Sequence, residues 1–114
     1  MGAEVVLSIA SCTVEELAAY FRRGFRFVEL AIVFVEPDER IIAHNQRCIT
    51  AIHQGHDMVW SLIPEEHFIT VHRARTHLEV FNAGDWMIVP ELPNFACQTT
   101  DFFKYLGFTN PPST

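Results

Sequence analysis

The stretch FRFVELAIVFV, residues 25–35, decides the fold of this chain. It is rich in β-branched and aromatic residues, which favour strands. Its first side chains alternate between two faces, and from Leu30 onward both faces are apolar. A strand that is apolar on both faces is typically covered on both sides. We therefore expect a central strand here, ended by Glu36–Pro37–Asp38 because proline cannot continue a central ladder.

A helix is predicted before this strand. Thr13 and Glu16 have the spacing of a capping box, in which each side chain bonds the backbone of the other residue. Gly24 is expected to end the helix, because glycine readily adopts the left-handed conformation of a helix terminus. The apolar face of the helix consists of Val14, Leu17, Ala18 and Phe21. Further toward the N-terminus, Glu4 to Ala10 has the composition of a first strand.

The segment from Glu39 to Gln54 has two interpretations. Ile41, Asn45, Cys48, Ile49 and Ile52 share one face at helical spacing. The alternative is two β segments, IIAH and CITAIH, joined through Asn45–Gln46. We favour the helix, and Gly55 then begins a turn.

The second half of the sequence is typical of short strands separated by turns. Strands are expected at Met58 to Ile63, Phe68 to Val71, Thr76 to Phe81 and Trp86 to Val89. Asn82 to Asp85 resembles a hairpin turn between the last two strands, with Gly84 in a positive-φ conformation. From Phe95 onward either a closing strand or a final short helix is expected. The fold class predicted is therefore α+β, as one domain over residues 1–114: a mostly antiparallel sheet or half-open barrel of about five or six strands with one or two packed helices.

Composition narrows the classes of function. The 114 residues are 49% hydrophobic and 19% charged, which suits a globular core. The formal net charge is −6, and the basic residues cluster only at Arg22–Arg23–Arg26 and Arg73–Arg75. Nucleic-acid binding is disfavoured, because it depends on basic surfaces that displace counterions from phosphates. No apolar stretch approaches the roughly 20 residues of a membrane span.

The cysteines indicate a reducing compartment. Cys12, Cys48 and Cys97 are odd in number and widely spaced, which is typical of buried, unreactive thiols and not of a disulfide framework. We therefore expect a cytoplasmic protein.

The last third of the chain carries a recognisable pattern. Gly84-Asp85-Trp86-x-Ile88 is followed by Phe95, Asp101 and Phe103. This pattern resembles the C-terminal signature of small phage and prophage proteins of uncharacterised function. The resemblance implies a mobile-element origin and a similar fold, and it brings no catalytic residue with it.

Histidines supply the candidate metal and ligand sites. His53, His56 and Asp57 are weak candidates for metal ligands, because imidazole and carboxylate suit zinc, but no further ligand stands at a diagnostic spacing. The other reading is a polar helix end, and no cofactor is expected. A second set of polar and aromatic residues is expected to line a ligand pocket if the sheet curls into a barrel: His67, His72, His77, Glu79 and Trp86.

Aromatic residues near the C-terminus supply a candidate interface. Phe102 and Phe103 are consecutive, so a regular element would direct them to different sides. Together with Tyr105 and Phe108 they are expected to build a homodimer interface.

The function expected from these observations is a non-enzymatic binding or interaction module of mobile-element type, with a host or phage protein as candidate partner and no membrane association. The first alternative is a small-molecule-binding barrel or small enzyme with a His- and aromatic-lined pocket. The second is a His-based metal-binding protein.

Overall fold

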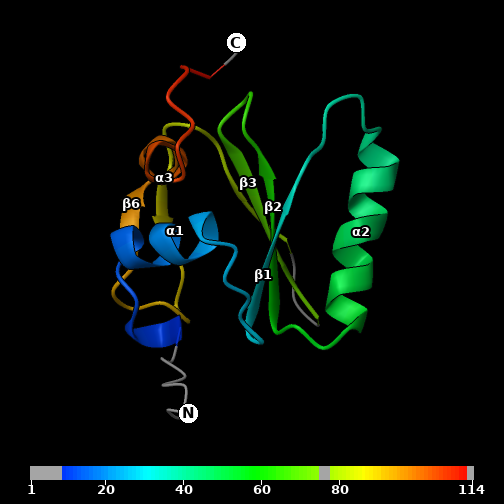
Figure 1. The fold of residues 1–114 in the computed structure, drawn as a ribbon, viewed down its shortest axis with the longest axis horizontal. Helices are drawn as coiled ribbons and strands as arrows, with labels where there is room; N and C mark the ends of the chain where they lie inside the picture. Colours follow the sequence, from blue (N-terminus) through cyan, green and yellow to red (C-terminus); the bar gives the residue numbers. More distant parts are fainter. Residues whose placement is uncertain (1–8, 75–77, 113–114) are drawn as a thin grey trace.

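The computed structural model describes residues 9–74 and 78–112. Over these residues the fold is α+β, as predicted, with helices on both faces of an open sheet (Figure 1). In chain order the elements are the 3-10 helix η1 (Ile9–Ser11), α1 (Val14–Arg22), β1 (Leu30–Phe34), α2 (Ile41–His53), β2 (Met58–Ile63), β3 (Phe68–Arg73), β4 (Glu79–Phe81), β5 (Trp86–Ile88), β6 (Ala96–Gln98) and α3 (Thr99–Tyr105).

Helix α1 forms where its local signals predict it. The Thr13 side chain accepts a hydrogen bond from the Glu16 backbone, and the Glu16 carboxylate accepts one from the Thr13 N–H at 3.0 Å. The predicted capping box is therefore confirmed. After the helix Gly24 has φ +76°, the left-handed conformation that glycine adopts without strain. The residues of α1 that are buried are Val14, Leu17 and Ala18.

The main sheet has the strand order β1-β2-β3-β4 among the described residues. β1 and β2 run parallel, whereas β2–β3 and β3–β4 run antiparallel. β1 therefore lies at an edge, and the prediction of a central strand was wrong in this respect. Its two apolar faces have another cause. Leu30 packs into the core beneath α1, and Ala31 and Val33 pack against the residues beneath α2.

Helix α2 confirms the helical interpretation of Glu39 to Gln54. Its buried side chains, His44, Cys48 and Ala51, recur at intervals of four and three residues and face the sheet. The ribbon shows α2 alone on its side of the sheet, with α1, α3 and β6 on the other (Figure 1).

The larger core lies on the side of α1 and α3. Trp60 on β2 is fully buried, and its ring contacts Phe95 and Phe102 at centroid distances of 5.4 and 5.6 Å. Its neighbour Val59 points to the opposite face and packs with Cys48 beneath α2. The alternation of a strand thus divides β2 between two layers.

Three details of the sequence prediction are corrected. The strand β5 pairs with β6 and not with β4, so the expected hairpin does not form. Gly84 does not adopt positive φ. Asp85 closes the turn, since its carboxylate accepts a hydrogen bond from the Asn82 N–H at 2.7 Å. The two alternatives expected after Phe95 both occur, one after the other: the strand β6 comes first and the helix α3 follows it.

Two predicted strands fall partly outside the described residues. Of Glu4 to Ala10, residues 4–8 lie outside, and Ile9 begins the 3-10 helix η1 instead. Of Thr76 to Phe81, residues 76–77 lie outside, and β4 begins at Glu79. In the described ranges no helix is both long and apolar enough to cross a membrane.

Candidate functional site

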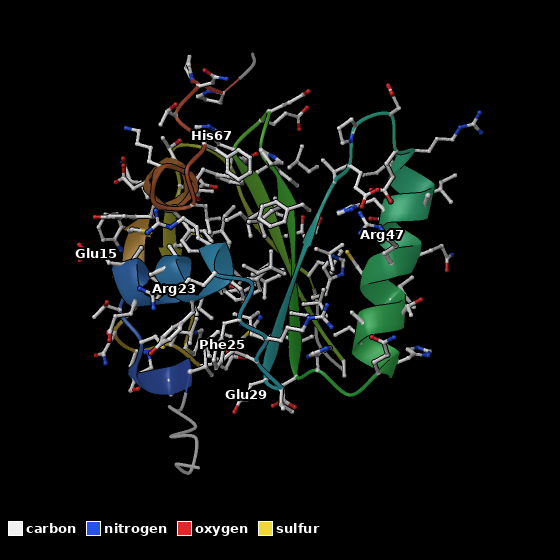
Figure 2. The ribbon with its side chains drawn as sticks, in the orientation of Figure 1. Glu15, Arg23, Phe25, Glu29, Arg47 and His67 are labelled. Carbon is white, nitrogen blue, oxygen red and sulfur yellow. The ribbon has the colours of Figure 1, made fainter. Side chains whose placement is uncertain are left out.

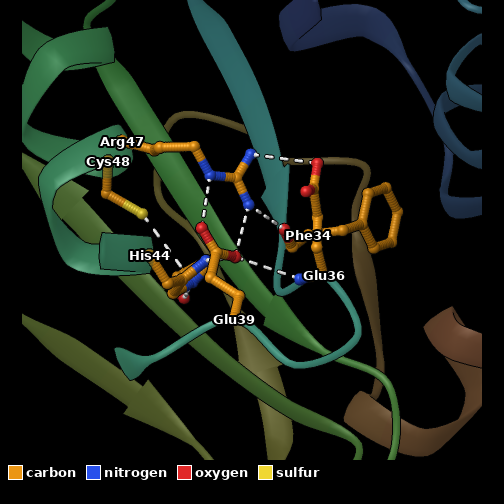
Figure 3. A network of polar contacts seen from close by, with 7 residues as sticks. Phe34, Glu36, Glu39, His44, Arg47 and Cys48 are labelled. Carbon is orange, nitrogen blue, oxygen red and sulfur yellow. Dashed lines mark hydrogen bonds and ion pairs between the residues drawn. The ribbon is translucent and has the colours of Figure 1, made fainter. Parts of the chain in front are cut away.

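A network of charged and polar side chains lies where β1 ends and the chain turns into α2 (Figure 3). Ligands of open α/β sheets bind beyond the carboxyl ends of parallel strands. β1 is paired in parallel with β2, so its carboxyl end is such a position. The network combines residues of β1, of the turn after it, of α2 and of β2: Phe34, Glu36, Glu39, His44, Arg47, Cys48 and Ser61.

Arg47 is the centre of this network. Its Nε donates to Oε2 of Glu39 at 2.8 Å, and its Nη2 donates to Oε1 at 2.7 Å. Nη2 also donates to the Phe34 carbonyl at 2.6 Å, while Nη1 lies 3.9 Å from Glu36. The bidentate pair fixes the plane of the guanidinium, as arginine forks do. In Figure 2 the Arg47 side chain extends from α2 toward β1.

The two carboxylates of the network differ in their environment. The Arg47 hydrogen bonds, and then the Glu36 backbone N–H, lower the pKa of Glu39 to about 2. Glu39 therefore stays ionised, and both of its oxygens are occupied. The Glu36 side chain is 69% exposed, whereas that of Glu39 is 11% exposed. Glu36 is consequently the carboxylate of this network that faces solvent.

A buried histidine–serine pair lies behind Arg47. His44 Nε2 and Ser61 Oγ are 2.5 Å apart, and His44 Nδ1 is 3.6 Å from Oε1 of Glu39. Burial lowers the pKa of His44, and the nearby Glu39 carboxylate only partly opposes this effect. A neutral ring with its proton on Nδ1, facing the carboxylate, leaves Nε2 to accept the Ser61 hydroxyl proton.

Access decides which part of the network can do chemistry. Ser61 borders a groove of about 430 Å³ between α2 and the strands β3 and β4, but it is only 4% exposed. A substrate atom could reach its hydroxyl only by displacing α2. Arg47 is 41% exposed, so a ligand can bind there without any rearrangement. The chemistry that the network offers to solvent is therefore a fixed cation beside an exposed carboxylate.

The predicted ligand-pocket residues do not come together. His67 is buried and stacks on the Phe103 ring at 5.0 Å near α3, and Figure 2 shows it far from Arg47. His72 lies on β3, and Glu79 on β4 is paired with Arg73. Trp86 is 55% exposed on β5. His77 lies outside the described residues. Over the ranges that the structure describes, the sheet stays open and encloses none of these side chains in a barrel interior.

The weak metal candidates also remain apart from any ligand set. His53 is exposed at the end of α2, and Nδ1 of His56 donates to the Val28 carbonyl at 2.9 Å. The ranges that the structure describes contain no group of three or more His, Cys, Asp or Glu residues arranged to hold a metal ion.

The predicted interface residues divide into two kinds. Phe102 and Phe103 are fully buried in the core, so neither can contribute to a subunit interface in this fold. The two rings have different neighbours: Phe102 contacts Trp60 and Phe95, whereas Phe103 contacts His67 and Phe108. Tyr105 is exposed and donates to Glu15 at 3.3 Å, and Phe108 is partly buried against Phe34. The three cysteines are free and buried, and burial raises the pKa of Cys97 to about 12.

Sequence reasoning missed the residues that form the network. Glu39 and Arg47 are not among the candidate site residues of the sequence analysis, yet Arg47 holds Glu39 in a bidentate pair. The signal that could have revealed the network is His44, which shares the buried face of α2 with Cys48. A polar residue on an apolar helical face must find a partner. The sequence does not show that this partner is Ser61, which lies on another element.

Comparisons with known proteins bear on the fold. No protein-family model and no curated protein matches the chain. Among solved structures it is similar to the crystal structure of "a putative nuclease belonging to DUF820" from Anabaena variabilis ATCC 29413. The TM-score is 0.57 and the sequence identity 22%, over 72% of this chain and 48% of that chain. This chain thus matches about half the length of that protein, and the likeness shows a shared fold.

The comparison corrects the expected function. The protein that shares this fold is described as "a putative nuclease", and this description contradicts the expectation of a non-enzymatic binding module without catalytic activity.

Proposed function

We propose that this chain is a nuclease-type hydrolase that acts on phosphodiesters, and that its functional centre is the network around Arg47. The observation that carries the proposal is a fixed, solvent-facing guanidinium at the carboxyl end of β1, in a fold shared with a protein described as "a putative nuclease". Function resides in sites and not in folds, so the argument depends on what this network can do.

Arg47 is suited to bind a phosphodiester. Its Nε and Nη2 are occupied by Glu39 and by the Phe34 carbonyl, which hold the guanidinium in place. Nη1 lies 3.9 Å from Glu36, beyond hydrogen-bonding distance, and its N–H groups can donate to a phosphate oxygen. Arg40, at the N-cap of α2, is exposed and adds a second positive charge nearby. These two cations can contact a phosphate directly, in a chain whose net charge is −6.

Glu36 is suited to activate water. Its carboxylate is exposed and lies beside the guanidinium, so a water molecule that bonds Glu36 would also face a phosphate bound to Arg47. In the proposed step the water oxygen attacks phosphorus and transfers its proton to Glu36. The bond from phosphorus to the leaving oxygen breaks, and that oxygen takes a proton from solvent. Such general-base assistance typically contributes a factor of about 10² to 10⁴ in rate.

Many nucleases hold divalent cations with clustered carboxylates. The described residues do not fit a fixed metal centre, because both oxygens of Glu39 are bonded to Arg47 and no group of three ligands is present in those ranges. The guanidinium occupies the position between the two carboxylates where a cation would be attracted. We therefore derive no step through a metal ion.

The test is hydrolysis of labelled single-stranded DNA, duplex DNA and RNA, and of bis(p-nitrophenyl) phosphate, by untagged protein with Mg²⁺, with Mn²⁺ and with EDTA. Glu36→Gln should lower kcat by about 10²-fold or more. Arg47→Lys should raise KM, because lysine cannot form the bidentate pair with Glu39 that holds the cation in place. Matched controls are Glu65→Gln and Lys104→Met, which change exposed charges elsewhere and should leave the rate unchanged.

Two outcomes would overturn the proposal. The first is an absence of cleavage of every substrate by folded protein in all three conditions. The second is cleavage that Glu36→Gln and Arg47→Lys leave unaltered while circular dichroism shows both variants folded, which would point to a contaminating enzyme or another site.

A further inference from the structure

The outer edge of β1 has backbone groups that β2 does not use. The Met58 N–H donates to the Glu29 carbonyl, and the Val35 N–H donates to the Leu62 carbonyl, each at 3.0 Å. Because hydrogen-bonding directions alternate along a strand, odd-numbered residues here face β2. Even-numbered residues from Leu30 to Phe34 direct their N–H and C=O groups away from it. Among the described residues β1 pairs with β2 alone.

A groove of about 350 Å³ follows this edge. One wall is made by the segment between α1 and β1, including Phe25 and Phe27, and the other by the end of α2, including Ala51 and Gln54. The groove also touches β1 residues of both faces, so it passes over the outer edge of the strand. Figure 1 shows β1 between the layer of α1 and the layer of α2, and Figure 2 shows Phe25 and Glu29 near its start. A groove with layers on both sides and a strand edge at its base has the shape of a missing strand.

The surroundings of this edge are apolar. Phe25 is 49% exposed and Val28 is 77% exposed, and both lie in the segment that leads into β1. An exposed apolar strand edge invites pairing with another strand unless it is covered. Strand addition of this kind gains main-chain hydrogen bonds and places alternate side chains against the two walls.

The charges at the two ends of β1 indicate which strand would pair with its outer edge. Arg22, Arg23 and Arg26 precede the strand and outnumber Glu29 at its start, whereas Glu36, Asp38 and Glu39 follow it and outnumber Arg40 and Arg47. In an antiparallel pair of two identical strands, the basic end of each copy lies beside the acidic end of the other. Parallel pairing would place like charges together. The edge is therefore complementary to itself in the antiparallel sense, which is the requirement of a two-fold interface.

We propose that β1 pairs antiparallel with β1 of a second copy of this chain, with Ile32 on the two-fold axis. In this register the outward-facing residues of each strand oppose each other, so Ile32 exchanges two backbone hydrogen bonds with its counterpart and Leu30 opposes Phe34. The two four-stranded sheets become one continuous sheet. Beyond the strand the chain bends at residues 28–29 and turns at Asp38, which has φ +64°, so the residue-by-residue register ends there. The antiparallel arrangement brings the basic segment that contains Arg26 to the same end of the interface as the acidic turn of the other copy, which contains Glu36 and Asp38.

The test is the oligomeric state of the untagged chain by sedimentation equilibrium and native mass spectrometry. At roughly 100 μM, where a micromolar dimer is almost fully formed, the wild type should be dimeric. Arg26→Glu and Glu36→Lys should each weaken the dimer by about tenfold or more, because each places like charges together at both ends. Mixing these two variants should partly restore dimers, because the reversed charge at position 26 of one copy then meets the reversed charge at position 36 of the other, although Asp38 keeps one unfavourable contact. Glu65→Lys, at an exposed turn, is the matched control and should leave the dimer intact.

A backbone variant provides an independent measurement. Ile32→Pro removes an N–H that faces away from β2, so it should abolish the dimer and leave the β1–β2 ladder formed. A wild type that is monomeric at this concentration would overturn the proposal. A dimer that withstands both charge reversals would also overturn it and would place the interface elsewhere. These readouts do not involve phosphodiester hydrolysis, so their failure and that of the proposed function are distinguishable.

Discussion

His44 should make the stability of this protein fall as the pH decreases from about 7 to 5. The ring is fully buried, its Nε2 is bonded to Ser61, and its Nδ1 has no hydrogen-bond partner among the described residues. Burial therefore lowers the pKa of His44 below its ordinary value of 6.5. In the unfolded chain the same imidazole regains its ordinary pKa. Across this window the unfolded state binds more protons than the folded state.

The sign and size of the effect follow from proton linkage. Stability is fully present above pH 6.5 and is lost as the pH falls toward the lowered pKa of the folded state. One such group contributes a slope of up to about 1.4 kcal/mol per pH unit. His72 contributes a second slope of the same sign, because burial and then the neighbouring His44 also lower its pKa. Glu39 acts only at much lower pH, since its pKa is about 2.

The measurement is urea unfolding followed by tryptophan fluorescence at several pH values between about 7.5 and 5. The variant His44→Gln keeps a polar group beside Ser61 but cannot titrate, so its slope should be about half that of the wild type. His53→Gln removes an exposed imidazole from the same helix and should keep the full slope. If His44→Gln also keeps the full slope, the buried imidazole is not the source of the pH dependence.

Three further predictions concern stability and thiol reactivity. Thr13→Ala removes the capping box of α1 and should lower the free energy of unfolding by about 0.5–2 kcal/mol in chemical denaturation, and an unchanged value would contradict the capping role. Arg73→Met leaves Glu79 and Glu91 without the guanidinium that binds both and should cost about 1–3 kcal/mol at pH 7. The cost should be smaller at pH 4, because Arg73 lowers the pKa of Glu91 in the folded protein and the unfolded chain begins to protonate Glu91 at that pH. Burial raises the pKa of Cys97 to about 12. Thiol titration of the native protein at pH 8 should therefore be slow and should become rapid in denaturant. Rapid labelling of the native protein would instead show an accessible thiolate.

The predictability of each element depends on how local its determinants are. Helix α1 could be predicted because Thr13 and Glu16 contact each other three residues apart, and the contact itself defines the helix start. Helix α2 was ambiguous because it has no side-chain cap at Arg40, and its buried face includes the polar His44. Its helical state depends on a partner on β2 that the local pattern does not contain. The position of β1 could not be inferred, because apolarity on both faces arises equally from neighbouring strands and from covering layers.

The same limit applies to the candidate site. Glu39 and Arg47 are eight residues apart and meet only because the turn after β1 folds back on the first turns of α2. Phe34 contributes a backbone carbonyl, which carries no sequence signal at all. The separate histidines, by contrast, are conspicuous in sequence and end in unrelated environments: His67 beneath α3, His56 on the Val28 carbonyl. Residue type alone therefore does not indicate which polar side chains the fold brings together.

Arg47 is involved in both proposals, and substitutions of Arg47 and Arg26 test the two proposals separately. The Phe34 carbonyl that Arg47 binds belongs to the outward-facing set of β1, the same set that a second strand would use. Arg47 thus occupies one lone pair of this carbonyl at the carboxyl end of the strand, where the second copy would bring its Leu30 N–H. A carbonyl has two lone pairs, so the guanidinium and a partner strand can bind it together.

Arg47→Lys should therefore impair hydrolysis without dissociating the dimer. Arg26→Glu should dissociate the dimer without disturbing the pair between Arg47 and Glu39. If Arg47→Lys dissociated the dimer as strongly as Arg26→Glu does, the guanidinium would be organising the strand edge, and its role as a phosphate-binding group would lose its support.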